Sequence, residues 1–342
     1  MPARPSPTRL LRIGTAAAAA GLVLVLGGCS SDPSTPRAPH TSAPAPSPTH
    51  TRPLLTVQQA DQIVDRYQQV NTVANARQDA TLLGTVEAGS TFELSRADYK
   101  QWSTFSAKEK KEYLEPWSYT QRTYYIPAQG KATWFMMRAH TTAQGKPSKN
   151  PSLAVFDNTD GKGFKLVFSV HGIEGKLPAA LRGRDGLVTP VPATATSGSL
   201  APRDVTASFE DLYATGGQQE GTRIDRTTPS AKTALKIYKE RNKELGPKGG
   251  RTRYFAAKPT HPEVYALKAG DGVLALVPLA HTSELMVTNS GLQISPSKVE
   301  KLYGAKTGPI VTDVFHGQAA AYLPVRGNAR VLGFTYSVVD AH

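Results

Sequence analysis

Ser295 and Lys298 come nearest to a catalytic pattern in this sequence. They form S-x-x-K, and a K-T-G sequence follows at residues 306–308. In serine acyl-transfer enzymes these two patterns surround a serine that attacks a carbonyl carbon and becomes acylated. Covalent acyl transfer is therefore the chemistry that this spacing would indicate if both patterns lined one site.

The residues around Ser295 favour a structural role instead. Penicillin-binding proteins and class A β-lactamases carry K-T-G far downstream of S-x-x-K, with S-D-N between the two. Here eight residues separate Lys298 from Lys306, and no S-D-N lies between them. We expect a short helix that Ser295 caps, with Pro296 in its first turn and Gly304 at its end.

The histidines show no spacing typical of a metal or catalytic site. No two of the 8 His lie three or four residues apart, and H-E-x-x-H, G-x-S-x-G and G-x-x-x-x-G-K-[ST] motifs are absent. We predict no metal, no cofactor and no enzyme activity, although three scattered histidines could still converge in space. The histidines in question are His140, His171, His261, His281 and His316.

The segment KATWFMMRAHT, 131–141, is the best candidate for a ligand site. Alternation along a strand places Trp134, Met136, Arg138 and His140 on one face. In a curved sheet, such a face could line a pocket with an apolar floor and a polar rim. The alternative is that Trp134 and Met136 pack in the core, while Arg138 and His140 reach solvent.

Cys29 is the only cysteine, and it follows a basic segment and an apolar run at residues 16–26. The sequence Leu26-Gly27-Gly28-Cys29 resembles the lipobox of bacterial lipoproteins. This resemblance implies a signal peptide over residues 1–28, cleavage between Gly28 and Cys29, and lipidation of Cys29 with acyl chains such as palmitate. A permanent signal anchor is the alternative, although the uncharged stretch is short of the ~20 residues that span a bilayer.

Composition divides the remaining chain into segments. Residues 29–53 are rich in Pro, Ser and Thr and predict an extended tether that buries no core. A second stretch rich in Gly, Pro, Ser and Thr, 184–204, predicts a linker between domains at 54–183 and 205–342. Because these domains hold no cysteine, disulfides and thiolate chemistry are excluded from them.

Both domains show helical periodicity followed by strand periodicity, which predicts an α+β fold with two curved antiparallel sheets. This order resembles the helix-and-sheet cone of nuclear-transport-factor-2-like and cystatin-like domains. The whole chain resembles lipoproteins of high-GC Gram-positive bacteria. The predicted helices begin after Thr56, Ser106, Asp204 and Pro229, and strands are expected at 119–127, 131–141, 151–157, 163–172, 251–257, 263–268, 272–282, 284–289, 291–295, 317–325 and 329–339.

The chain carries a net charge of +13, and basic residues recur at 108–111, 182–184, 239–243 and 248–253. A location outside the cytoplasmic membrane excludes nucleic acid and leaves anionic lipids and cell-wall polyanions as partners. We therefore expect a lipid-anchored, extracytoplasmic, non-catalytic binding module, attached to the membrane at Cys29. The alternatives are an enzyme that uses His140 or His171 as a general base, and a scaffold that recruits a membrane protein.

Overall fold

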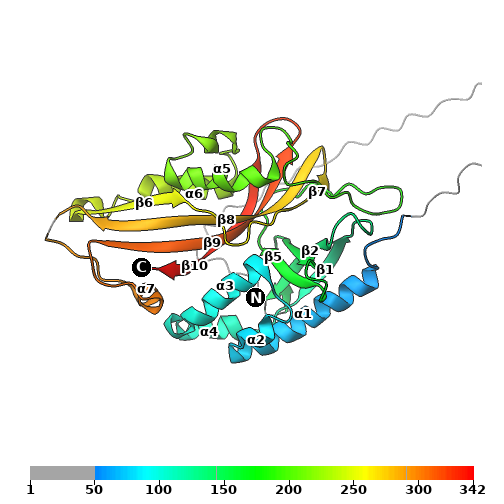
Figure 1. Ribbon diagram of the computed structural model, residues 1–342, viewed down its shortest axis with the longest axis horizontal. Helices are drawn as coiled ribbons and strands as arrows, with labels where there is room; N and C mark the ends of the chain where they lie inside the picture. The colour runs from blue at the N-terminus through cyan, green and yellow to red at the C-terminus, as the bar shows by residue number, and fades with distance from the viewer. Residues whose placement is uncertain (1–50, 144, 290) are drawn as a thin grey trace, which may run out of the picture. The chain divides into compact units, whose positions relative to one another are not determined.

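The computed structural model describes residues 51–143, 145–289 and 291–342. Gly28 and Cys29, the predicted signal peptide and most of the predicted tether lie outside the described residues. From residue 51 onward the chain forms one compact unit. It contains two antiparallel sheets and helices that pack against them, so the predicted α+β class is confirmed (Figure 1).

The first half of this unit begins with helices, as its capping sequences predict. The Thr56 hydroxyl accepts a hydrogen bond from Gln59 N at 3.2 Å, and the Gln59 side chain accepts one from Thr56 N at 2.8 Å. Ser106 and Glu109 repeat this capping box at the next predicted helix. The helices are α1 (Val57–Arg77), α2 (Ala80–Leu83), α3 (Gly89–Gln101) and α4 (Ala107–Leu114).

The first sheet follows these helices in the order β1-β2-β4-β5, with a short β3 beside β2. All of its neighbouring strands are antiparallel. Short turns join them, including the turn at 158–164 that the sequence predicts between β4 and β5. The strands are β1 (Tyr119–Tyr125), β2 (Trp134–Ala143), β3 (Lys146–Pro147), β4 (Ser152–Asp157) and β5 (Lys165–Val170).

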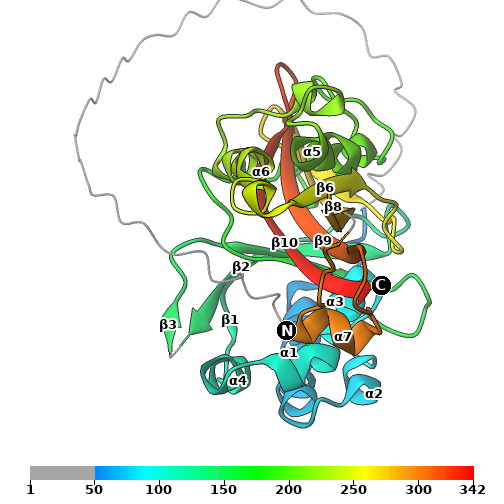
Figure 2. The same cartoon turned by 90° about the vertical axis from the view of Figure 1, so that its left-hand side faces the viewer.

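The second half has longer strands. Its sheet has the order β10-β9-β8-β6, with β7 paired to the other end of β8. Helices α5 and α6 cover one face of this sheet (Figure 2). The elements are α5 (Val205–Ala214), α6 (Pro229–Glu240), β6 (Gly250–Ala256), β7 (Tyr265–Ala269), β8 (Gly272–Val287), α7 (Lys298–Tyr303), β9 (Ile310–Pro324) and β10 (Arg330–Ala341).

Three apolar clusters hold these layers together. One lies between α1 and the first sheet, around Tyr67, Phe135 and Phe156. A second lies between α5, α6 and the second sheet, around Phe209. The third, which we call the shared core, lies between the two sheets and takes residues from both halves. Its buried members include Met136, Leu153, Phe168, Leu267, Leu276 and Ala320.

Gln318 adds hydrogen bonds across the shared core. Its side chain accepts from Ser169 N at 2.8 Å and donates to Val167 O at 3.3 Å, both on β5. It also donates to Thr91 Oγ1 on α3 at 3.1 Å. A neighbouring strand would bond to β5 through the same kind of donor and acceptor. The Gln318 side-chain amide therefore takes the place of a strand next to β5, at the edge of the first sheet.

Several sequence expectations need correction. Ser297, not Ser295, caps α7, and its hydroxyl accepts from Glu300 N. The strands expected at 272–282 and 284–289 form one strand, β8, of 16 residues. The strand expected at 291–295 is a loop in which Ile294 forms an isolated bridge with Gly308. Helix α3, with no side-chain cap, was not among the expected elements.

The segment at 184–204, which we predicted as a linker, contacts both halves. Val188 forms a bridge with Pro127 of the first half, and Pro190 forms one with Leu267 of the second. Val188 and Leu200 are buried, at 4% and 1% exposed. The segment therefore takes part in packing, and the position of a domain boundary within it stays a prediction.

Candidate functional site

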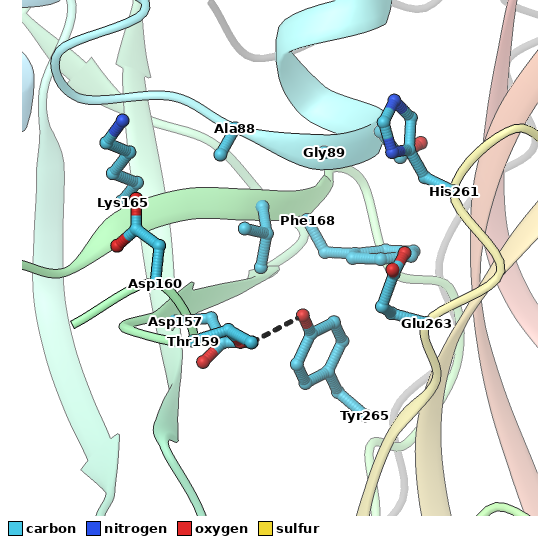
Figure 3. A pocket seen from close by; sticks show the side chains of 12 residues that line it. Ala88, Gly89, Asp157, Thr159, Asp160, Lys165, Phe168, His261, Glu263 and Tyr265 are labelled. Carbon is cyan, nitrogen blue, oxygen red and sulfur yellow. Dashed lines mark hydrogen bonds between the residues drawn. The ribbon is translucent and has the colours of Figure 1, made fainter. Parts of the chain in front are cut away.

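A pocket opens where the first turn of α3, strand β5 and the segment between β6 and β7 meet (Figure 3). Its volume is ≈ 250 Å³, and both halves of the chain contribute to its wall. The pocket is lined by Ala88, Gly89, Ser90, Asp157, Thr159, Asp160, Lys165, Val167, Phe168, His261, Glu263 and Tyr265.

Asp157 and Tyr265 form the polar part of the floor. The Tyr265 hydroxyl donates to Asp157 Oδ2 at 2.7 Å. Thr159 donates to the same oxygen at 2.6 Å, and Thr133 donates to Oδ1 at 2.7 Å. Burial, and then the nearby Asp157 charge, raise the pKa of Tyr265 far above its usual range, so the phenol stays protonated and keeps donating. Three hydroxyl donors thus hold a buried carboxylate in place.

The start of α3 forms one side of the pocket. Ala88 N donates to Leu166 O at 3.0 Å, which fixes the helix start over β5. No side chain caps this helix, so the N–H groups of its first turn keep their positive partial charge. Gly89 has a φ of +55°, in the left-handed region that glycine adopts most easily. Ser90, in the same turn, is 3% exposed and lines the pocket.

Basic and acidic side chains both line this pocket. Lys165 and Asp160 lie at one end, whereas His261 lies at the other end beside α3, with Glu263 and Phe168 below it (Figure 3). Lys165 Nζ donates to the carbonyl of Gly84, at the end of α2, at 2.9 Å. Among the described residues, the Glu263 carboxylate makes no ion pair or hydrogen bond. Each end of the pocket therefore carries both a basic and an acidic side chain.

A histidine–glutamate pair links β9 to α3. His316 Nδ1 on β9 is 2.9 Å from Glu93 Oε2 on α3. Burial alone would raise the pKa of Glu93, but the hydrogen bond and charge of His316, with the charge of His261, lower it. Glu93 is therefore ionised and pairs with β9 on the inner side of α3.

A family model described as a domain of unknown function, DUF8094, matches residues 51–342. The chain belongs to the DUF8094 family. It is also similar to an uncharacterized lipoprotein of Streptomyces coelicolor, with 32% identity over 332 residues that cover 94% of this chain and 91% of that protein. The expected similarity to lipoproteins of high-GC Gram-positive bacteria is confirmed, and the lipobox itself stays a prediction.

In this DUF8094 chain, the four residues predicted to line a ligand pocket lie on β2, at the shared core. Met136 is fully buried, and Trp134 packs edge-to-face on Tyr265 at a ring distance of 5.6 Å. Arg138 is half-buried, and His140 Nδ1 lies 2.7 Å from Ser148 O. None of the four lines the pocket at α3. Whether they bind a ligand of their own stays a prediction.

His171, the second residue considered as a general base, is held between two buried serines. Its Nδ1 lies 2.8 Å from Ser152 Oγ, and its Nε2 lies 2.8 Å from Ser169 Oγ. Burial lowers the pKa of His171 to about 3, so the ring is neutral. Ser152 and Ser169 are 1% and 2% exposed, so a substrate has no access to either hydroxyl.

His281 and Glu210 form a buried pair within the second half. His281 Nδ1 is 2.9 Å from Glu210 Oε2, and Tyr336 donates to Oε1 at 2.8 Å. Aromatic rings surround the imidazole, with Tyr336, Phe315 and Tyr213 at 4.7, 4.9 and 5.1 Å. The pair is enclosed by the rings and cannot meet a substrate from solvent.

The basic residues concentrate on α6 and the segment after it. Residues 229–258 contain nine Lys or Arg but only two Glu and no Asp. Four exposed lysines, spaced at three or four residues, form a row along the solvent side of α6 and the turn that follows. We call this set the lysine row: Lys232, Lys236, Lys239 and Lys243.

The described residues contain neither a metal-binding cluster nor a membrane-spanning helix. No group of three or more His, Cys, Asp or Glu side chains is arranged to hold a metal ion in this part of the chain. Within the same residues, no helix is both long enough and apolar enough to cross a membrane. Of the charged residues described, those around the α3 pocket remain the best candidates for a binding site.

Proposed function

We propose that this chain is a lipoprotein anchored through Cys29 on the extracytoplasmic face of the membrane, and that its folded part is a non-catalytic binding module. The observation that carries the binding role is the α3 pocket, whose wall combines both halves of the chain and whose rim carries the exposed Glu263 carboxylate. The similarity to a Streptomyces lipoprotein supports the anchor. Two acyl chains would hold it stably.

The enclosure of the histidines favours binding over catalysis. A general base must lie within hydrogen-bond reach of the proton it removes from a substrate. His171 uses both ring nitrogens on buried serines, and aromatic rings enclose His281. His261 does line the pocket, but among the described residues no serine or threonine hydroxyl is hydrogen-bonded to it, so the pocket holds no pair of nucleophile and general base.

Acyl labelling of whole cells tests the anchor. Cells that express the chain with Cys29→Ala should incorporate no labelled fatty acid into it and should accumulate a precursor that retains residues 1–28. Ser30→Ala is the matched control and should label and mature normally. If the Cys29→Ala chain still labels and matures, the lipoprotein proposal fails.

The lysine row favours a second binding role, contact with an anionic component of the envelope. Four adjacent exposed ammonium groups attract a polyanion, and salt screens such an attraction strongly. We expect the chain to be retained on isolated envelopes at low ionic strength and released as salt is raised. A variant in which the four lysines of the row become glutamine should be retained less.

The matched control changes the charge by the same amount elsewhere. It replaces four exposed lysines that form no row, and it should be retained like the unaltered chain. Equal loss in both variants would show that net charge alone drives retention, and would contradict a role for α6. The control positions are Lys146, Lys149, Lys162 and Lys176.

A further inference from the structure

We infer that strand β6 binds an extended, acidic segment of a partner protein, which pairs with the open edge of β6 as a further strand of the second sheet. None of the residues that line the α3 pocket belongs to β6. The lysine row lies on α6 and the turn after it. This inference therefore goes beyond the proposed function, since it assigns a partner to a third surface.

The register of β6 shows which of its backbone groups face away from the sheet. Ala257 N, directly after β6, donates to a carbonyl of β8 at 3.0 Å. Because hydrogen bonding alternates along an antiparallel pair, the odd-numbered residues of β6 bond to β8 and the even-numbered ones point outward. Thr252 N is already taken, since it donates to Asn242 Oδ1 at 2.6 Å. In the described part of the chain, Thr252 O, Tyr254 N, Tyr254 O and Ala256 N have no hydrogen-bond partner.

The other outer strands are covered or interrupted. Lys268 N on β7 donates to Thr189 O at 3.0 Å. On β10, Leu332 O accepts from Glu174 N at 2.7 Å. The side-chain amide of Gln318 bonds to β5, and a shift of register interrupts the pairing of β1. Unpaired edges accept another chain as a further strand, so proteins usually cover or blunt them, and the edge of β6 is left as a site for strand addition.

The two faces of β6 differ. Tyr254 packs on Tyr213 of α5 at a ring distance of 6.0 Å, so α5 covers the face that carries the even-numbered side chains (Figure 2). Arg251, Arg253 and Phe255 lie on the opposite face, and all three are exposed. A segment that pairs with β6 would place every second side chain on this exposed face, beside two guanidinium groups and one aromatic ring.

The charge around this edge selects for an acidic partner. Within residues 51–143, 145–289 and 291–342, the side chains of Arg251 and Arg253 form no ion pair, although Glu284 of β8 lies opposite Arg253. Lys248 precedes β6, Lys258 follows it, and both are exposed. Opposite charges on neighbouring strands stabilise their pairing, and like charges oppose it. A second copy of β6 would bring more arginine to the edge, so charge complementarity favours carboxylates opposite Arg251 and Arg253 instead.

Fluorescence anisotropy tests this pairing with the chain that lacks residues 1–28 and carries Cys29→Ser. The probe is the labelled peptide Thr-Val-Thr-Glu-Thr-Glu-Thr, which in antiparallel pairing places valine opposite Phe255 and the glutamates opposite Arg253 and Arg251. At low ionic strength it should bind with a Kd below about 1 mM. N-methylation of its third and fifth residues blocks amides that face β6 and should weaken binding about tenfold or more. N-methylation of the fourth and sixth residues, whose amides face away, is the matched control and should change the Kd less than about twofold.

Substitutions in β6 locate the site. Ala256→Pro removes one outward N–H without removing a bond to β8 and should weaken binding about fivefold. Ala256→Gly keeps this donor and should bind like the unaltered chain. Arg251→Gln combined with Arg253→Gln should weaken binding about tenfold at low ionic strength. The variant with glutamine at the four positions of the lysine row loses more positive charge but leaves β6 intact, so its Kd should change less than about threefold.

Three results would contradict strand addition at β6. The peptide fails to bind, the two patterns of N-methylation weaken binding equally, or the lysine-row variant loses as much affinity as the double arginine variant. If Ala256→Pro proves unstable in urea, the methylated peptides still distinguish strand pairing from simple charge attraction, because they use the unaltered β6. The anchor at Cys29, the α3 pocket and the retention by the lysine row do not involve β6 and would stand in each case.

Discussion

Replacing Gln318 with methionine, which has nearly the same shape, should test how strongly the two halves depend on each other. The change removes three hydrogen bonds across the shared core, each worth about 1 kcal/mol net. It also leaves Ser169 N–H, on a residue 2% exposed, without its acceptor, which costs a further ~1–3 kcal/mol. The apolar side chain of methionine offsets part of this loss. We expect the free energy of unfolding to fall by about 3 kcal/mol.

Urea unfolding followed by both tryptophan fluorescence and far-ultraviolet circular dichroism measures this change. All three tryptophans lie in the first half, so fluorescence reports that half while circular dichroism reports both. Gln129→Met, at an exposed glutamine, is the control and should change the stability by less than ~0.5 kcal/mol. A loss below ~1 kcal/mol for Gln318→Met would refute our account of this amide as a substitute for a strand.

Three further substitutions test other features. Burial raises the pKa of Asp313 to about 6, so ionisation of this carboxyl group lowers the stability of the fold as pH rises toward that value. Asp313→Asn should therefore raise the melting temperature at pH 7.5 and have little effect at pH 4. The expected gain in the free energy of unfolding at pH 7.5 is about 1 kcal/mol, after discounting for the partial exposure of the group. Gly272→Ala would place a Cβ 2.1 Å from Leu323 O, so thermal unfolding should show a loss above ~2 kcal/mol. His281→Phe removes the partner of the buried Glu210 carboxylate and should cost about 3 kcal/mol in urea unfolding, whereas an unchanged midpoint would contradict the pairing.

Local sequence signals predicted much of the fold. Capping boxes at Thr56 and Ser106 located the starts of α1 and α4, and alternation located the strands of the first sheet. Helix α3 escaped prediction because it begins without a side-chain cap and buries polar residues such as Ser90 and Thr91. The break predicted within β8 arose from the polar residues around Ser283, which the second sheet accommodates at half-buried positions.

The α3 pocket could not be predicted from the sequence. Its residues come from a helix start, a β-turn and the segment at 257–264, which lie far apart along the chain. The sequence did predict strands at 151–157 and 163–172, but the turn between them gives no reason to expect a ligand. The histidine that lines the pocket, His261, stands between loop residues and lacks any motif that would have set it apart.

The shared core also has a consequence for the order in which the chain can fold. A ribosome makes the first half first, and β1–β5 can pair as soon as they emerge. The face of that sheet that carries Met136, Leu153 and Phe168 finds its apolar partners only after β7, β8 and β9 have been made, more than one hundred residues later. During that interval an apolar surface is exposed, and such surfaces promote aggregation. We therefore expect the early chain to need protection by a chaperone until the second half arrives.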